Sequence, residues 1–297
     1  MSEFLRKLLS GAPIGTADWQ EHLIEAHRAA PSMTPTAFSP FKTVDGRNSY
    51  EKLADSLAGI DEAALVVLDL ACGDGALAPY CLKRCARIER FIGVDMSQAE
   101  LAVASGRRAE KNVQWICAKA EELPLEAESV DLVLCHMAFM LMFPIKPVVS
   151  EIRRVLKKGG AFSAVVGNPD RTAGLFGQFQ GRIRSFLKSE FPRMGVPKIG
   201  DPRATSILGL KELFNGQAGF VEAVDIDDFD LKVRLEPGGV WNFFKDFYLV
   251  GMLPPESKEK LKADMIRFAD ENRGPAGMIE FDFPMRRFSV HRSGAPG

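Results

Sequence analysis

Two carboxylates on either side of a glycine-rich turn are the residues of this sequence best suited to hold a small ligand. Asp69 lies in an apolar run, Gly73 and Gly75 follow it, and Asp95 ends the next apolar run. A glycine-rich turn that leads into a helix lets a ligand approach the backbone, and the helix N-terminus offers unpaired N–H groups. A carboxylate at the tip of the following strand can accept hydrogen bonds from ribose hydroxyls. The pattern therefore indicates a nucleoside ligand.

Asp69 decides which nucleoside the turn is expected to hold. The run Gly73-x-Gly75-x-x-Ala78 fits a relaxed dinucleotide fingerprint, so a nicotinamide- or flavin-dependent oxidoreductase is one interpretation of the turn. A pyrophosphate has no need of a carboxylate four residues before the first glycine, whereas a ligand with an ammonium group can pair with one. S-adenosylmethionine carries such a group, and Asp69 therefore favours this cofactor.

Residues 66–77 resemble the first motif of the class I S-adenosylmethionine-dependent methyltransferases, and Ala71 stands where that family more often has glycine. Asp95 and Met96 resemble the second motif of the family. The resemblance implies that the carboxylate of Asp95 binds ribose and that the side chain of Met96 packs on adenine.

The resemblance continues along the chain. Residues 113–125 are similar to the segment that holds the adenine edge through the backbone of Ala120, with Lys119 in place of the usual acid. In all, the resemblance covers roughly residues 60–166 and 208–293, about two thirds of the sequence.

The family resemblance implies a cofactor, a site and a reaction. The implied cofactor is S-adenosyl-L-methionine, and the expected reaction is direct, in-line transfer of its methyl group to an oxygen, nitrogen or carbon of a small-molecule metabolite. The residues that it implies at the cofactor are Tyr50, Asp69, Ala71, Cys72, Gly73, Gly75, Asp95, Met96, Ala120, Glu121 and Cys135.

His136 is the candidate catalytic residue. It follows the fourth apolar run, and in open α/β sheets the carboxyl ends of the strands face the ligand crevice. A neutral imidazole there can take a proton from a substrate hydroxyl or amine. The alternative interpretation is a buried histidine that only packs against the cofactor, because methyl transfer depends mainly on placement of the nucleophile.

The remaining histidine and cysteine pairs do not indicate a metal site. Cys81 and Cys85 share a helix face but lack a nearby histidine or CxxC pair. His22 and His27 are five residues apart and do not share a helix face, so we expect both on the surface of an N-terminal cap.

Short apolar runs alternate with amphipathic helices, which is typical of a parallel sheet covered on both faces. Helices are predicted over 76–84, 98–111 and 148–157, the last stopped by Gly159-Gly160. Strands are predicted over 65–70, 91–94, 113–118, 130–135, 161–166, 220–226 and 281–291. Together with the resemblance, this order predicts a doubly wound, Rossmann-like α/β fold. We expect seven strands with one antiparallel strand, the last one, inserted between two others.

The domain organisation follows from the same pattern. Residues 1–60 lack strand patterning and predict a helical cap, with helices over 2–9, 17–29 and 49–58 and a proline-rich separator at 31–40. The predicted methyltransferase core comprises residues 61–167 and 208–293. Substrate or cap insertions are predicted at about 168–207 and 236–276.

Composition restricts the partners. The 38 Lys and Arg residues against 39 Asp and Glu residues give a net charge of −1, which does not favour nucleic acid or an anionic membrane. Neither an Asn/Asp-Pro-Pro-Tyr/Phe motif nor a Pro-Cys nucleophile follows the fourth strand, so DNA methyltransferase chemistry is not expected. Five unevenly spaced cysteines and the absence of a signal-like start favour a cytoplasmic protein. We expect a monomer or homodimer that acts on a small molecule.

The sequence is also compatible with two alternative functions. The first is the oxidoreductase that the glycine pattern allows. The second is a non-catalytic methyltransferase fold that serves as a binding module, which Lys119 and the lack of a certain base make possible.

Overall fold

The computed structural model describes residues 3–60, 62–107, 111–192, 200–221 and 223–294. The predicted elements 2–9, 98–111 and 220–226 and the predicted insertion 168–207 each include residues outside these ranges. Among the described residues, one seven-stranded sheet has the order β3-β2-β1-β4-β5-β7-β6. Its strands are β1 (Leu65–Leu70), β2 (Ile88–Asp95), β3 (Val113–Cys117), β4 (Val130–His136), β5 (Leu156–Gly167), β6 (Asp225–Leu235) and β7 (Ile279–His291).

Strand β7 lies antiparallel to both β5 and β6, while the pairs formed by β1 to β5 are parallel. The predicted α/β fold with one antiparallel strand inserted between two others is therefore confirmed. The helices are α1 (Glu3–Ser10), α2 (Thr16–Ala29), α3 (Met33–Phe38), α4 (Ser49–Ala54), α5 (Ala78–Arg84), α6 (Gln98–Gly106), α7 (Ile145–Val155), α8 (Gly174–Glu190), α9 (Ile207–Leu213), α10 (Gly239–Phe244), α11 (Tyr248–Gly251) and α12 (Pro255–Glu271). Short 3₁₀ turns lie at Asp55–Gly59, Phe139–Leu141, Pro169–Arg171, Pro202–Ala204 and Gly216–Ala218.

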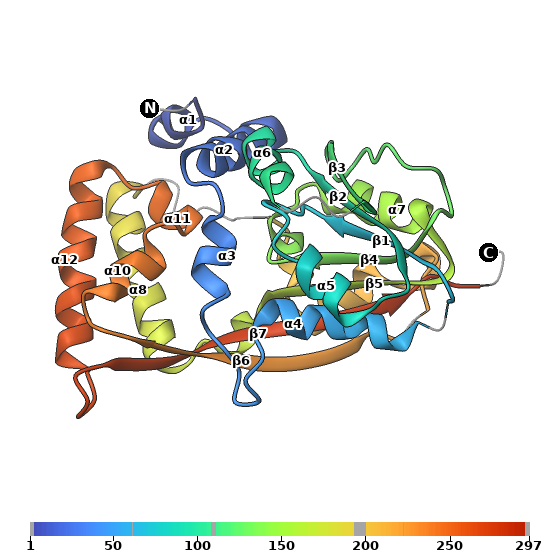
Figure 1. Cartoon of the computed structure of the whole chain (residues 1–297). Helices are drawn as coiled ribbons and strands as arrows, with labels where there is room; N and C mark the ends of the chain where they lie inside the picture. The colour runs from blue at the N-terminus through green and yellow to red at the C-terminus, as the bar shows by residue number, and fades with distance from the viewer. Residues whose placement is uncertain (1–2, 61, 108–110, 193–199, 222, 295–297) are drawn as a thin grey trace.

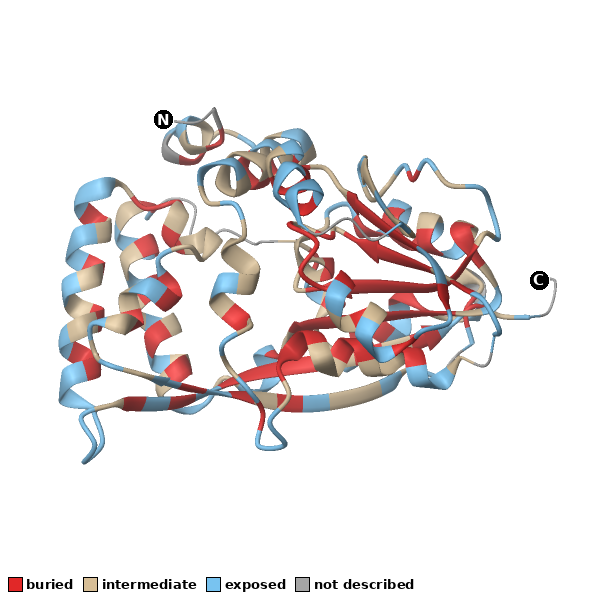
Figure 2. Ribbon diagram, in the orientation of Figure 1, coloured by how far each residue is buried: buried red, intermediate tan, exposed pale blue. Residues whose placement is uncertain are grey.

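The central strands are buried on both faces, as Figure 2 shows. In β1, Leu65 and Val67 belong to one buried cluster, and Leu68 and Leu70 belong to another on the opposite face. This division follows from the two-residue period of a strand. Because one apolar run must fill both clusters, β1 is hydrophobic almost throughout, and Asp69 is its one charged residue.

A separate helical layer packs on the far part of the long β6–β7 hairpin. Helices α8, α10 and α12 contact one another, and α8 contacts β7 (Figure 1). Their interface is aromatic: the ring of Phe179 lies 5.1 Å from those of Phe244 and Phe268 and 5.6 Å from that of Phe281. Helix α3 lies between this layer and the sheet (Figure 1).

The proline-rich segment 31–40, predicted as a separator between cap helices, itself contains the short helix α3. Pro35 is the third residue of this helix, in the first turn, where a missing N–H breaks no helical hydrogen bond. The buried side chain of Phe38, at the end of the helix, packs 5.1 Å from the ring of Phe283 on β7. Tertiary packing therefore stabilises a helix that local sequence signals did not indicate.

Gly159 and Gly160 do not stop a helix, as was predicted; they lie within β5. Helix α7 ends at Val155 and the strand begins at the next residue. The register shifts between the β4 residues Val130 and Leu132, and φ at Gly159 is +78°. The two glycines therefore belong to an irregular stretch of β5, not to a helix cap.

The sixth strand begins later and extends further than the predicted 220–226. Its sequence is rich in charge, which hid the strand from a search for apolar runs. Ion pairs between neighbouring strands match this charge: Arg286 of β7, 2% exposed, binds both carboxylate oxygens of Asp228, and Lys232 pairs with Asp282.

The indole of Trp115 on β3 covers two glycines at the ligand-facing end of the sheet, Gly75 and Gly93. A Cβ atom at Gly93 would overlap this indole. We predict that Gly93→Ala lowers the free energy of unfolding by about 1–3 kcal/mol through overpacking. The measurement is denaturant unfolding. Gly106→Ala, at the end of α6 with open space around it, is the control and should not lose stability. Equal stability of the two variants would contradict the prediction.

Candidate active site

A cavity of about 1110 Å³, including its open mouth, lies at the carboxyl ends of β1, β2 and β4. The predicted site residues that line it are Tyr50, Asp69, Ala71, Cys72, Gly73, Asp95, Met96, Ala120, Glu121 and His136. Two predicted residues are not among those lining it: Gly75 lies beneath Trp115, and Cys135 is fully buried in the core of the opposite sheet face. A direct side-chain contact from Cys135 therefore has no support in this arrangement.

The carboxylate of Asp95 joins the tips of two strands. One oxygen accepts a hydrogen bond from the backbone N–H of Gly73 at 2.8 Å, and the other accepts one from Ser97 at 2.8 Å. Burial raises the pKa of this carboxyl above its usual value, although the two N–H donors oppose the shift. Each oxygen keeps a further lone pair, which ribose hydroxyls could use.

Asp69 lies 1% exposed at the end of β1, and its Oδ2 has no hydrogen-bond partner among the described residues. Burial raises the pKa of this carboxyl well above the ordinary value, and the nearby Asp95 and Asp74 raise it further. A buried carboxylate without a partner is costly, so a cationic or donor ligand in the cavity would satisfy it.

The turn after β1 has an unusual backbone. Ala71 has a φ of +57° and Gly73 a φ of +53°, both in the left-handed region. An alanine is strained there, which is consistent with the glycine that the family more often has at this position. This conformation carries the turn around the cavity and aims the Gly73 N–H at Asp95.

Helix α2 covers the end of the cavity where Ala120 and Glu121 lie. The side-chain amide of Gln20 donates to Glu121 at 2.7 Å and accepts from the amine of Lys119 at 2.8 Å. Lys119, which replaces the family's usual acid, therefore binds the cap, while Glu121, two residues later, lines the cavity.

His136 is buried between the sheet and the N-terminal helices. Its Nε2 lies 2.9 Å from the hydroxyl of Ser49, and its ring stacks on Tyr50 with a centroid distance of 3.8 Å. Its Nδ1 has no partner among the described residues. Burial lowers the pKa of His136 to about 3, so the imidazole is neutral near pH 7.

A chain of polar contacts that was not predicted from the sequence crosses the cavity. The Nδ1 of His27 lies 2.6 Å from Glu100 of α6, and its Nε2 lies 2.8 Å from the hydroxyl of Tyr248 in α11. All three residues line the cavity. The expectation that His22 and His27 lie on the cap surface is therefore wrong: His22 is 7% exposed and stacks on Phe4. No sequence signal linked residues 27, 100 and 248, because only tertiary packing joins them.

These residues fit S-adenosylmethionine. Asp69 offers an unpartnered carboxylate oxygen for an ammonium group, and Asp95 offers acceptors for ribose hydroxyls in the same cavity. Met96 and Ala120 supply an apolar surface against which the adenine ring could pack. Among the described residues, no cluster of three or more His, Cys, Asp or Glu side chains is arranged to hold a metal ion.

Comparison with known proteins agrees with this geometry. Residues 68–164 match the methyltransferase domain family. This segment is therefore a methyltransferase domain, and it is similar to the class I S-adenosylmethionine-dependent methyltransferases. The ubiquinone/menaquinone biosynthesis C-methyltransferase UbiE of Campylobacter jejuni is 31% identical over 136 residues, which are 44% of this chain and 55% of that protein. The malonyl-[acyl-carrier protein] O-methyltransferase of Marinomonas sp. is 38% identical over 122 residues, 38% of this chain and 45% of that protein.

The crystal structure of YcgJ from Bacillus subtilis superposes with a TM-score of 0.55 at 19% identity, over 83% of this chain and 99% of that one. At this identity the likeness shows the fold. The chain spans about half the length of the two curated methyltransferases it matches.

No helix in the described ranges combines the length and apolarity that a bilayer crossing requires.

Asp69 gives a first test of this site. Its folded-state pKa lies above that of the unfolded chain, so the wild type loses stability as pH rises from about 4 through the folded-state value. We predict that Asp69→Asn raises the thermal unfolding midpoint at pH 7 by roughly a few degrees, and that the gain shrinks toward pH 4. Asp131→Asn is the matched control. Asp131 is a buried acid whose carboxylate accepts from the Val66 N–H and pairs with Lys157, so this variant should lose stability. A destabilised Asp69→Asn protein at pH 7 would contradict the assignment.

His136 gives a second test, in which stability should change with pH in the direction opposite to that expected for Asp69. Its folded-state pKa of about 3 lies below the unfolded value of 6.5, so its contribution to stability is complete above pH 6.5 and is lost as pH falls toward 3. Relative to His136→Gln, the wild type should lose on the order of 3 kcal/mol between pH 7 and pH 4 in denaturant unfolding. His291→Gln, which replaces a histidine at an exposed position, is the matched control. Parallel pH curves for the wild type and His136→Gln would show that the ring is not buried in neutral form.

Proposed function

We propose that this protein is an enzyme that binds S-adenosylmethionine in the cavity at the ends of β1, β2 and β4 and transfers its methyl group to a small-molecule acceptor. One observation carries the proposal. A buried carboxylate with an unpartnered oxygen, Asp69, and the backbone-fixed carboxylate of Asp95 line the same cavity. A ligand that carries an ammonium group and a ribose satisfies both.

Bound S-adenosylmethionine supplies a methyl group on a positively charged sulfur. In the proposed complex, Asp69 pairs with the ammonium group, Asp95 accepts from the ribose hydroxyls, and Met96 packs on the adenine. The backbone of residues 71–73 and 120 and the side chains of Tyr50 and Glu121 complete the lining. Gly75 and Cys135 contribute from behind the lining, by allowing close packing of the turn and the strand.

For His136 we propose a packing and orienting role in preference to the general base. Its Nε2 already faces the Ser49 hydroxyl, and a pKa of about 3 makes the ring a poor proton acceptor at neutral pH. The base hypothesis predicts that His136→Gln lowers kcat far more than cofactor affinity. The packing role predicts that both change together.

A small, partly apolar acceptor is supported by the named activities of two relatives, which concern a quinone pathway and a malonyl carrier protein. The net charge of −1 gives no support to a nucleic-acid substrate. All five cysteines are free thiols, which suits the cytoplasm, and we propose a monomer or homodimer.

Calorimetric titration with S-adenosylhomocysteine tests the proposed function. We predict micromolar binding that Asp95→Asn weakens by about tenfold or more, the cost of losing charged hydrogen bonds to ribose. Asp131→Asn, a buried acid away from the cavity, should bind as the wild type does. Binding of NADH or FAD instead would favour the oxidoreductase. Binding of S-adenosylhomocysteine without turnover across a metabolite panel would favour the non-catalytic binding module.

A further inference from the structure

A second cavity of about 1140 Å³, including its open side, adjoins the proposed cofactor cavity. Four residues line both cavities and form the boundary between them: Thr34, Met137, Leu141 and Tyr248. They come from α3, from the turn after β4 and from α11. A molecule in the second cavity would therefore meet the cofactor across this boundary.

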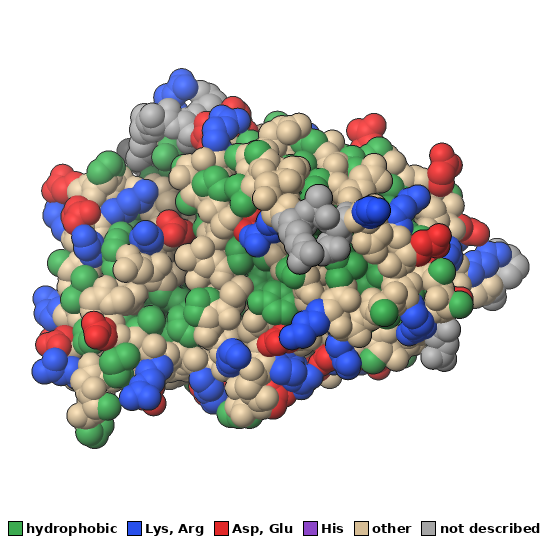
Figure 3. All heavy atoms as spheres, viewed as in Figure 1, with side chains coloured by type: hydrophobic (Ala, Val, Ile, Leu, Met, Phe, Trp, Pro, Cys, Tyr) green, Lys and Arg blue, Asp and Glu red, His purple; other side chains and the backbone are tan. Residues whose placement is uncertain are grey.

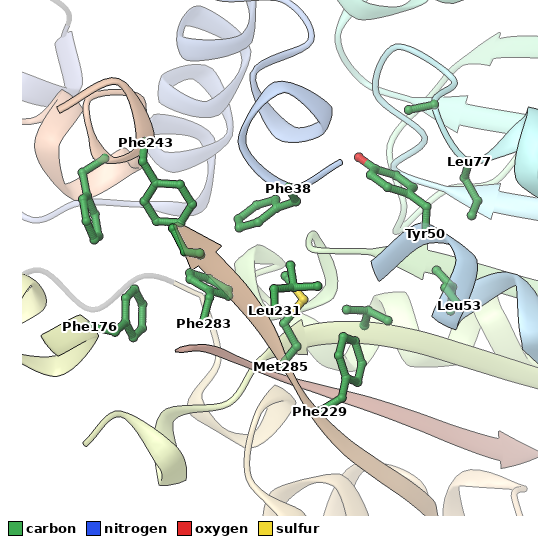
Figure 4. Close-up of a cluster of buried hydrophobic side chains, with 14 of the residues drawn as sticks. Phe38, Tyr50, Leu53, Leu77, Phe176, Phe229, Leu231, Phe243, Phe283 and Met285 are labelled. Carbon is green, nitrogen blue, oxygen red and sulfur yellow. The ribbon is translucent and has the colours of Figure 1, made fainter. Parts of the chain in front are cut away.

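The wall of the second cavity is mostly aromatic and apolar. Phe38 of α3, Phe243 of α10 and Phe283 of β7 gather around the space between the helical layer and the sheet, as Figure 4 shows. Figure 3 shows hydrophobic side chains gathered in the middle of this face of the molecule. A large apolar molecule would fit this cavity. Its lining also includes two charged residues, Arg184 and Asp246.

Tyr248 is the boundary residue best placed for proton transfer, because its hydroxyl is hydrogen-bonded to the imidazole of His27. Of the four shared residues, Thr34 and Tyr248 have polar side chains, and the hydroxyl of Tyr248 is hydrogen-bonded to His27. Its ring packs edge-on against Trp19 at a centroid distance of 6.2 Å. Trp19 is itself fixed by a hydrogen bond from its indole N–H to the carbonyl of Leu141 at 2.9 Å. The position of the Tyr248 ring is therefore well determined.

The hydrogen bonds give this chain a direction. A carboxylate only accepts, so the Nδ1 of His27 carries the proton that is donated to Glu100. In the tautomer whose only ring proton is on Nδ1, the Nε2 accepts a hydrogen bond from the hydroxyl of Tyr248. Glu100 is 2% exposed and also accepts from the backbone N–H of Ser32 at 3.1 Å, which holds it in place. The lone pairs of the Tyr248 oxygen remain free to accept a hydrogen bond from a bound molecule.

Tyr248 is not itself a phenolate. Burial raises its pKa above the ordinary value, and the acidic groups that face it, Asp95 and Glu100, raise it further. It can take up a proton only if it passes its own to His27. His136 is less suited to this work because it lines the cofactor cavity alone and already faces Ser49.

We propose that the second cavity holds an apolar acceptor with a reactive hydroxyl group, and that Tyr248 is the catalytic residue that accepts the proton of this hydroxyl. His27 and Glu100 are positioning residues that act through Tyr248. This proposal rests on the proposed methyltransferase function and names its acceptor class.

The proton and electron balance is complete within these groups and the proposed sulfonium donor. As the acceptor oxygen bonds to the methyl carbon, the carbon–sulfur bond breaks and its electron pair stays on sulfur. The hydroxyl proton moves to the Tyr248 oxygen while the Tyr248 proton moves to His27. The resulting imidazolium is paired with Glu100.

The test uses 4-nitrophenol, an aromatic hydroxyl compound whose phenolate has its own absorbance, with the full-length protein at a pH one unit below the probe's aqueous pKa. We expect the bound probe to show about fivefold more phenolate than the free probe. Tyr248→Phe and His27→Gln should bind the probe and lose this excess. Tyr80→Phe is the matched control: the Tyr80 hydroxyl accepts from Asn48 and does not line either cavity, so the excess should persist.

A cavity variant shows where the probe binds. Ala37 lines only the second cavity, so Ala37→Phe should abolish probe binding and keep S-adenosylhomocysteine binding in calorimetry. If Ala37→Phe does not fold, Thr36→Trp, at an exposed lining position, serves the same purpose. Probe binding unchanged in a folded cavity variant would overturn the acceptor site.

The remaining outcomes separate this proposal from the proposed function. If S-adenosylhomocysteine binds but Tyr248→Phe keeps the phenolate excess, the relay is wrong and the methyltransferase function stands. If all variants bind the probe as expected but none binds S-adenosylhomocysteine, the proposed function is wrong. A lower melting temperature of Tyr248→Phe with an unchanged phenolate excess would leave only a structural latch and overturn the relay.

Discussion

The hydrogen bond from the Gly73 N–H to Asp95 is the contact on which the site depends. It joins the turn after β1 to the tip of β2 and so fixes the position of the backbone at the floor of the cavity. The left-handed conformation at Ala71 and Gly73 is what aims this N–H at the carboxylate. Asp69 lies beside this fixed turn, and one of its buried oxygens has no hydrogen-bond partner among the described residues. Burial of an unpaired carboxylate oxygen costs free energy, so the cavity favours a ligand with a positive charge.

The N-terminal helices complete the site through polar contacts with residues far away in the chain. In α2, Trp19, Gln20 and His27 bind the turn after β4, the turn after β3, and helices α6 and α11 respectively. One helix thus covers the proposed cofactor cavity and also contacts Tyr248 at the boundary with the second cavity. The same helix therefore contributes to the lining of the first cavity and to the proposed proton relay.

Much of the fold could be predicted from the sequence because its signals are local. Strands β1 and β4 lie within a residue of their predicted bounds, since fully buried parallel strands need continuous apolar runs. Local sequence signals did not predict elements whose stability comes from residues far away in the chain. Strand β6 is charged and depends on cross-strand ion pairs such as Asp228 with Arg286, and α3 depends on the packing of Phe38.

The sequence by itself determined the glycine turn, the two acids and their order along the chain, because strand, turn and helix are built from neighbouring residues. It placed Asp69, Gly73, Asp95 and His136 at one edge of the sheet, where the structure has them. Only the tertiary structure decided that Cys135 points into the opposite core and that residues 27, 100 and 248 meet over the cavity. The physical reason is that such contacts join segments tens to hundreds of residues apart, and their geometry is set by how the helices pack, which no local spacing encodes.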